Sequence, residues 1–304
     1  MLKGIKLQSD GLTQRGMVMS YHCSPFAIDF SYGYREDAIE VGDKAHHAFN
    51  YHYKSKYTIG FEVEKNEFPT DTKVTNLFKG FERDGSCGVE AITNILPLLP
   101  RSLWRMKVYD MFHQAQEFID VPCDSRCSTH MHIGIDGMNG EEIRDTISPY
   151  MGIMYALFRK RLANSFCRMD IFMDGSMAGI PTYNDHKYRV CKTNEYTAEL
   201  RIPSKITSVS QLKRRYELAY EMVDCAVNRL PYSAYVRKAK PILMDMYGDA
   251  DKVKQIVMLG AHFQKMIDTK TINRYVLSFM EGWDTVNECR GALHEHYGRS
   301  CRNI

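Results

Sequence analysis

Three segments of the chain alternate strictly between apolar and polar residues, at 57–63, 128–136 and 196–202. Successive side chains of a strand point to opposite faces of a sheet, so a period of two residues predicts β-strands. A further short strand is expected near 89–93, after the turn-rich segment 82–88. We expect each alternating strand to be half buried, with its polar side in solvent, as antiparallel sheets commonly are.

Helical spacing of apolar residues dominates the last third of the chain. A period near 3.6 residues predicts helices at about 210–229, 232–247, 250–268 and 271–281. The same spacing predicts earlier helices over 102–119 and 141–162, and 183–191 is interpreted as a loop and a strand. Strands mixed with helices and followed by a helical tail predict an α+β fold.

These patterns divide the chain of 304 residues into three parts. Residues 1–56 are rich in Tyr and His without clear periodicity and are interpreted as an N-terminal extension of open role. Residues 57–206 are expected to form a core of strands and helices. Residues 207–304 are expected to form a helical part packed on that core.

Composition limits the possible partners. A formal net charge of +3 is too small to predict nucleic-acid binding, and no motif for it is present. The basic clusters 159–161 and 213–215 are interpreted as solvated helix faces, although the first could also contact a polyanion such as ATP. No apolar run approaches the roughly 20 residues of a membrane span, and the polar first twenty residues do not resemble a signal peptide. We therefore expect a cytoplasmic protein without a membrane partner, whose nine cysteines are reduced thiols.

The polar sides of the three alternating strands carry the residue types that bind metals and phosphate. They are Glu62 and Glu64, His130 and His132, and Glu199 and Arg201. Along one strand the first two carboxylates would lie roughly 7 Å apart. The small residues Gly60 and Gly134 on the same sides leave room for a ligand. The turn-rich segment, with Asp84, and the short strand after it, with Glu90, could add two carboxylates at the sheet edge, although the segment taken alone is typical of a plain turn.

Such a set of side chains suits Mg²⁺ or Mn²⁺, because hard divalent ions prefer oxygen ligands and accept some imidazole. Divalent ions that bridge nucleotide phosphates, with an arginine nearby, neutralise charge during phosphoryl transfer. The sequence contains no P-loop, no dinucleotide-binding glycine motif and no serine nucleophile elbow. An ATP site would therefore need a different architecture.

The order of these motifs resembles the glutamine synthetase / glutamate–cysteine ligase superfamily. More closely, the chain looks like the amidoligase (carboxylate–amine ligase) family of that superfamily. The resemblance covers about residues 57–206 and rests on the motifs Gly60–Glu64, Glu82–Glu90, His130–Gly134 and Glu199–Ile202. It implies an antiparallel sheet with a catalytic polar face and with helices on the other face.

The resemblance also implies an activity and its cofactors. ATP would phosphorylate a substrate carboxylate, and an amine would then attack the acyl phosphate to give an amide. The cofactors would be ATP and Mg²⁺ (or Mn²⁺). The substrates would be a small-molecule or peptide carboxylate and an amine, whose identities the sequence leaves open together with the oligomeric state.

The resemblance assigns roles residue by residue. One metal site would consist of Glu64, Asp84 and Glu90. A second, bridging the ATP phosphates, would consist of Glu62, His130 and Glu199. The remaining contacts would be His132 to the nucleotide, Arg201 to the transferred phosphate, and Arg168 to substrate or phosphate. The catalytic residues would thus be Glu62, Glu64 and Arg201.

Two other interpretations stay open from the sequence. Cys123, Cys127, His130 and His132 are all zinc-ligand types, although their spacing is unusual for a zinc site. The helical region 212–280 could instead form the surface of a non-catalytic binding module with a ligase-like fold, although its methionines and tyrosines are more often core residues.

Overall fold

The computed structural model describes residues 55–67, 77–84, 87–93, 95–113, 116–161, 167 and 189–269. Within these residues the chain forms a seven-stranded sheet in which every pairing is antiparallel. The strand order is β2-β3-β1-β5-β7-β6, and β4 pairs with β1 beside this path. The strands are β1 (Tyr57–Lys65), β2 (Phe78–Asp84), β3 (Gly88–Thr93), β4 (Leu96–Pro97), β5 (Thr129–Ile135), β6 (Cys191–Thr193) and β7 (Ala198–Leu200).

The strands predicted over 57–63, 89–93, 128–136 and 196–202 are present, with two differences, whereas 183–188 of the loop and strand interpreted over 183–191 lie outside the described residues. The segment beginning at Glu82 is not only a turn, because 82–84 belong to β2, which forms a hairpin with β3. Strand β7 is shorter than predicted, since Tyr196 and Thr197 lie in its connection to β6. The backbone N–H of Arg201 still donates to Val190 O, so this side of the sheet continues one residue beyond the strand.

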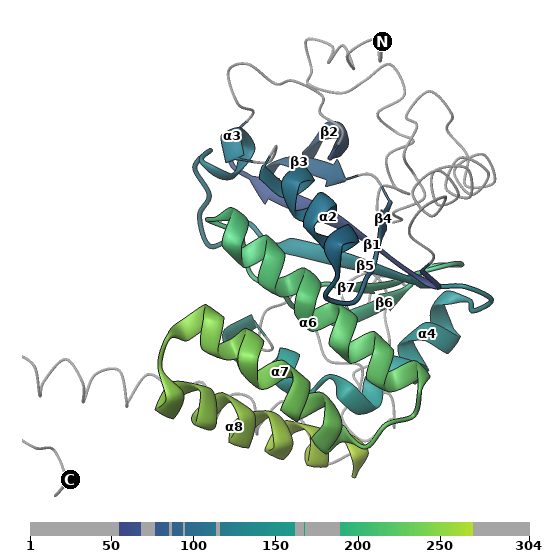
Figure 1. Ribbon diagram of the computed structural model, residues 1–304. Coiled ribbons are helices and arrows are strands. Elements are labelled where there is room, and N and C mark those ends of the chain that lie inside the picture. Colours follow the sequence, from purple (N-terminus) through teal and green to yellow (C-terminus); the bar gives the residue numbers. More distant parts are fainter. Residues whose placement is uncertain are drawn as a thin grey trace, which may run out of the picture.

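Helices cover one face of the sheet (Figure 1), where α2 and α6 cross it and α7 and α8 lie beyond α6. An edge-on ring contact between Phe61 of β1 and Phe112 of α2 identifies this as the face of the apolar strand positions. Phe112 in turn contacts Tyr216 of α6. The helical elements are α2 (Leu103–His113), α3 (Gln116–Ile119), α4 (Gly140–Ile147), η2 (Ser148–Tyr150), α5 (Gly152–Leu157), η3 (Arg159–Arg161), α6 (Val209–Val227), α7 (Tyr232–Tyr247) and α8 (Ala250–Asp268).

The α+β class is therefore confirmed as an antiparallel sheet with separate helices. The predicted helix over 141–162 is wrong as one unit, because it is divided into α4, η2, α5 and η3. Pro149 lies in η2, and proline disrupts a continuous helix because it lacks an N–H and clashes with the preceding turn. The three helices predicted between 210 and 268 are confirmed within two residues. The helix predicted at 271–281 lies outside the described residues.

Two buried cations hold the connection between β7 and α6. Arg215 donates to Ser204 O and Lys205 O, and its side chain is buried, so the prediction that the cluster 213–215 is a solvated helix face is wrong for this residue. Lys65, at the end of β1, is also fully buried and donates to Ile206 O. Both cations thus supply hydrogen-bond donors to backbone carbonyl groups of the β7–α6 connection.

Replacing Lys65 by Met is expected to lower the free energy of unfolding by about 3 kcal/mol or more, because buried bonds from a charged donor are lost. Its ammonium donates to Ile119 O, Val121 O and Ile206 O at 2.5, 3.1 and 3.1 Å. Urea unfolding of wild type, Lys65→Met and the exposed control Lys56→Met measures this. Equal losses in the two variants would contradict the structural role of Lys65.

The difference in unfolding free energy between wild type and Lys65→Met should depend on pH. Burial lowers the pKa of Lys65 below its ordinary 10.5, against the opposing effect of Cys123. Between the lowered pKa and about 10.5 the unfolded chain binds more protons than the folded one, so this group raises stability as pH rises. The gap in unfolding free energy between wild type and Lys65→Met should thus widen as pH rises from the lowered pKa toward 10.5.

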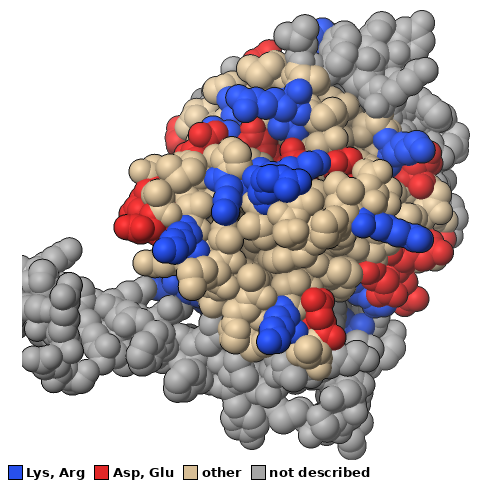
Figure 2. Space-filling model, turned by 60° about the horizontal axis from the view of Figure 1, so that its bottom comes forward, with Lys and Arg blue, Asp and Glu red and all other residues tan. Residues whose placement is uncertain are grey.

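The face of the molecule in Figure 2 carries lysines and arginines interspersed with aspartates and glutamates. Ion pairs between such oppositely charged side chains join Lys238 to Glu221 and Asp224, and Arg214 to Glu217. Among the described residues in this view, acidic side chains interrupt the basic ones, so the basic side chains form no single continuous stripe. Over the described part of the chain, no helix combines the length and the apolar character of a membrane span.

Candidate metal centre

The strand register brings the predicted polar residues together on one face of the sheet. Glu62 of β1 lies directly opposite His130 of β5, and His132 lies opposite Glu199 of β7. Glu64 lies opposite Glu90 of β3. Directly opposed residues of antiparallel strands share a face, so carboxylates and imidazoles from four neighbouring strands adjoin one another.

The prediction that this polar face is open to solvent is wrong. Exposed fractions are 1% for Glu62, 3% for His130 and 0% for Glu199, and Glu64, Glu90 and His132 are also buried. Alternation in the sequence reports which residues share a face, whereas exposure depends on what packs against that face. Ionisable groups removed from water in this way require compensating charge.

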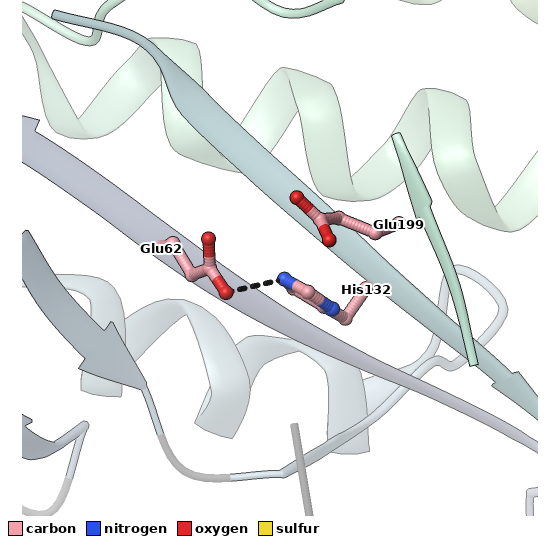
Figure 3. Close-up of side chains that lie close together, drawn as sticks. All are labelled: Glu62, His132 and Glu199. Carbon is pink, nitrogen blue, oxygen red and sulfur yellow. Dashed lines mark ion pairs between the residues drawn. The ribbon is translucent and has the colours of Figure 1, made fainter. Parts of the chain in front are cut away.

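Glu62, His132 and Glu199 form the first group with the spacing of a metal site (Figure 3). Each offers one ligand atom, and these atoms lie within 4.8 Å of one another. Glu62 Oε1 and His132 Nε2 are 2.7 Å apart, and Figure 3 shows both side chains pointing toward the same space as Glu199. Two carboxylates and an imidazole are a ligand set that divalent ions accept.

Glu62, Glu90 and His130 form a second group of the same kind. His130 Nδ1 lies 2.7 Å from Glu62 Oε2 and 4.0 Å from Glu90 Oε1. The same nitrogen lies 3.5 Å from Glu199 Oε1, so it faces three carboxylates. The two groups share Glu62, whose two oxygens point to different imidazoles. Glu62 is therefore placed to bridge two ions.

Glu199 is held ionised by its neighbours. Burial alone would raise the pKa of its carboxyl, but Lys192, Arg201 and the two imidazoles outweigh burial and hold that pKa well below its usual range. Lys192 Nζ lies 3.2 Å from Glu199 Oε2, and Arg201 forms an ion pair with Glu199 Oε1. A carboxylate that stays charged at neutral pH can serve as a metal ligand.

His130 is held neutral. Burial lowers the pKa of its imidazole well below the ordinary value, and the nearby Arg201 lowers it further, while Glu199 acts in the opposite direction. A neutral imidazole has a nitrogen lone pair for a metal ion, whereas the imidazolium has none. The electrostatics of the site thus keep both ligand types in the protonation states that coordinate metals.

The arrangement of the carboxylates fits a divalent cation. Among the described residues, Glu62, Glu90 and Glu199 gather around His130 Nδ1, and all three are buried. Carboxylates brought close together away from water repel one another, and a divalent cation between them offsets that repulsion. The donor set of carboxylates and imidazoles therefore fits a metal ion between β1, β3, β5 and β7.

The structure groups the predicted ligands differently from the family assignment. His132, assigned to the nucleotide, belongs to a metal-capable group, whereas Glu64 accepts bonds from Ser128. Asp84 ends β2 opposite Gly88, and the structure describes its backbone pairing only. Arg168 lies outside the described residues.

The zinc interpretation gains no support from the described residues. Among them, the groups whose ligand atoms lie close enough for one ion contain no cysteine. Cys123 Sγ instead lies 3.6 Å from Lys65 Nζ, on the opposite side of β1 from Glu62 and Glu64. Both Cys123 and Cys127 are free thiols.

Sequence reasoning missed two residues of this site, Lys192 and Ser128. Lys192 lies opposite Glu199 on the short edge strand β6, where three residues give too little alternation to identify a face. Ser128 precedes His130 by two residues, so the period of two already placed it on the polar face. That signal was available in the sequence.

Comparison of the chain with protein-family models and with curated proteins gave no match.

Proposed function

We propose that the protein is an ATP- and divalent-metal-dependent ligase that joins a carboxylate to an amine through an acyl phosphate. The observation that carries this proposal is that Glu62 belongs to both metal-capable groups on the sheet face. Two ions held in this way would neutralise the phosphates of ATP during transfer to the carboxylate. The motifs resembling amidoligases give the reaction class, and the ligase-like fold is part of the same proposal.

The residues of the chain would divide the work by their chemistry. Glu62, Glu90, Glu199 and the two imidazoles would hold the metal ions. Arg201 adjoins Glu199 at the end of β7, where its guanidinium would stabilise the negative charge that develops on the transferred phosphoryl group. Burial of the site strengthens these interactions, because charges attract one another more strongly in a medium of low polarity.

The proposal places the reaction in the reducing cytoplasm, and the described cysteines are free thiols. A non-catalytic binding module would retain the fold without ATP turnover. The helical methionines do not decide between the two, since Met222 is buried and Met258 of α8 is 63% exposed. The buried cluster of ionisable groups favours the enzyme, because such a cluster is costly to maintain without a function.

Calorimetric titration of ATP into the purified chain tests the proposal without knowledge of the substrates. We expect binding that requires Mg²⁺ and that weakens about 10- to 100-fold in Arg201→Ala, because charge-assisted bonds to phosphate are lost. Arg126→Ala is the matched control, since this arginine is exposed and pairs with Asp124 outside the site.

Two results would contradict the proposal. Folded protein that binds no ATP at millimolar concentration with Mg²⁺ would exclude the nucleotide site. Equal affinities of wild type and Arg201→Ala would remove the assigned phosphate contact. If binding occurs as expected, release of ADP in the presence of mixed carboxylates and amines identifies the substrate classes.

A further inference from the structure

The Ser128 side chain contacts both His130 and Glu64. His130 belongs to a metal-capable group, whereas Glu64 belongs to neither of the two groups. We propose that Ser128 is a positioning residue that fixes the proton of His130 on Nε2 and so presents Nδ1 as the metal-ligating atom. This inference rests on the metal site of the proposed function. It goes beyond that function by naming which atom of His130 binds the ion and which residue decides it.

The contacts of Ser128 are short and come from a fixed backbone. Its Oγ lies 2.9 Å from His130 Nε2 and 2.7 Å from Glu64 Oε2. The backbone N–H of Ser128 donates to the same Glu64 oxygen at 2.5 Å. The backbone of Ser128 also accepts from Glu64 N and bridges to Ser204, so β1 and the β7–α6 connection hold it from both sides.

The two nitrogens of His130 meet different surroundings. Nε2 faces the Ser128 hydroxyl, with Glu64 Oε1 at 3.5 Å. Nδ1 faces Glu62 Oε2, Glu199 Oε1 and Glu90 Oε1 at 2.7, 3.5 and 4.0 Å. Three carboxylate oxygens therefore gather at Nδ1. A cation bound there would use a nitrogen lone pair together with these oxygens.

The hydrogens available on Ser128 and His130 limit how their contacts can be hydrogen-bonded. A serine hydroxyl carries one hydrogen, and a neutral imidazole carries one. If the hydroxyl donates to Glu64 and Nε2–H donates to Oγ, both contacts of Ser128 are hydrogen bonds. The lone pair of Nδ1 then faces the carboxylates, which is the state that a metal ion requires.

The opposite arrangement explains the contacts less well. If the hydroxyl donated to Nε2 and Nδ1–H donated to Glu62, the series Ser128, His130 and Glu62 would have the spacing of a nucleophile, base and acid. The oxygens of Ser128 and Glu64 would then meet at 2.7 Å with no hydrogen between them. The favoured arrangement leaves His130 Nδ1 and Glu62 Oε2 at 2.7 Å with no hydrogen between them, but both belong to a metal-capable group, where a cation would bind both atoms. Glu64 belongs to neither metal-capable group, so its contact with Ser128 needs the hydroxyl hydrogen and favours the positioning role.

Titration of MnCl₂ into the full chain tests the inference, with Ser128→Ala compared with wild type. Outer-sphere partners of ligating histidines typically contribute about 10- to 100-fold to metal affinity, so a loss of that size is expected. Thr129→Val is the matched control, because the neighbouring Thr129 is buried on the opposite side of β5 and should leave affinity within about twofold.

A second measurement separates positioning from a general structural effect. In the Mg²⁺-loaded protein with ¹⁵N-labelled histidine, wild type should show His130 protonated at Nε2, and Ser128→Ala should lose this single ring signature. A folded Ser128→Ala protein with wild-type Mn²⁺ affinity would overturn the inference. Weaker binding with an unchanged ring signature would also overturn it.

Other outcomes are equally decisive. Wild-type protein that binds no Mn²⁺ would remove the metal site of the proposed function, and this inference with it. Covalent labelling of Ser128 by a fluorophosphonate would overturn the positioning role in favour of a nucleophile. If Ser128→Ala does not fold, Ser128→Cys replaces it, because a thiol of similar shape bonds weakly and should show the same loss.

Discussion

Glu62→Gln is expected to abolish turnover of the proposed ligase reaction while the chain stays folded. Glu62 belongs to both metal-capable groups, and its oxygens lie 2.7 Å from His130 Nδ1 and from His132 Nε2. Glutamine keeps the size of the side chain but has no charge and only one oxygen. Each group therefore loses its shared ligand, and affinity for Mn²⁺ should fall by at least about a hundredfold.

The free energy of unfolding of Glu62→Gln should not fall together with its metal affinity. Glu62 is buried and faces the same nitrogen of His130 as the carboxylates of Glu90 and Glu199. Replacing one of these adjacent carboxylates by a neutral amide removes repulsion between like charges, so in the absence of metal stability is expected to stay unchanged or to rise. If Glu62→Gln instead lost activity because it unfolds, its free energy of unfolding would be lower than that of wild type.

Three measurements on Glu62→Gln check this result: Mn²⁺ calorimetry, ADP release and urea unfolding in EDTA. Glu195→Gln is the control, because it makes the same chemical change at an exposed carboxylate in the β6–β7 connection. ADP release at the wild-type rate by Glu62→Gln, in folded protein, would rule out a role of Glu62 in holding the catalytic metals.

Gly140→Ala is expected to be among the most destabilising substitutions in the described core. Gly140 begins α4, and its backbone N–H donates to Glu195 O in the connection between β6 and β7. A Cβ at this position would lie 1.8 Å from Asn194 O and 2.5 Å from Thr197 O. Both are backbone atoms, so a side chain cannot rotate away and the hairpin has to move.

This displacement should lower the free energy of unfolding by about 3 kcal/mol or more, since forced overpacking against backbone is poorly tolerated. The same hairpin carries Lys192 and Glu199, so Mn²⁺ affinity should fall together with stability. Thermal unfolding and Mn²⁺ titration measure the two effects in one variant.

Gly137→Ala is the matched control for Gly140→Ala. Gly137 has a positive φ of 78°, but an added Cβ would meet nothing within 4 Å. Its substitution should cost about 1–2 kcal/mol through backbone strain alone and leave metal affinity unchanged. If Gly140→Ala cost no more than Gly137→Ala, close packing of α4 against the hairpin would not matter for stability.

Most residues of the candidate site could be predicted, because the period of two residues shows which side chains lie on the polar side of each strand. Glu62, His130 and Glu199 were assigned to one face from the period of two residues, and the register places their strands side by side. The grouping of ligands was less predictable. His132 was assigned to a nucleotide, yet its ring lies against Glu62, because contacts across strands depend on register and not on spacing along one strand.

The sequence alone determined the three alternating strands and which side of each is polar, because alternation is a property of neighbouring residues in one chain. It also determined the three long helices, whose periodic apolar faces extend over many turns. Only the tertiary structure decided that the polar face is buried, that β2 pairs beside β3, and that Lys65 and Arg215 bind loop carbonyls. These features depend on segments that are distant in the sequence, and no local pattern records which of them meet in the folded chain.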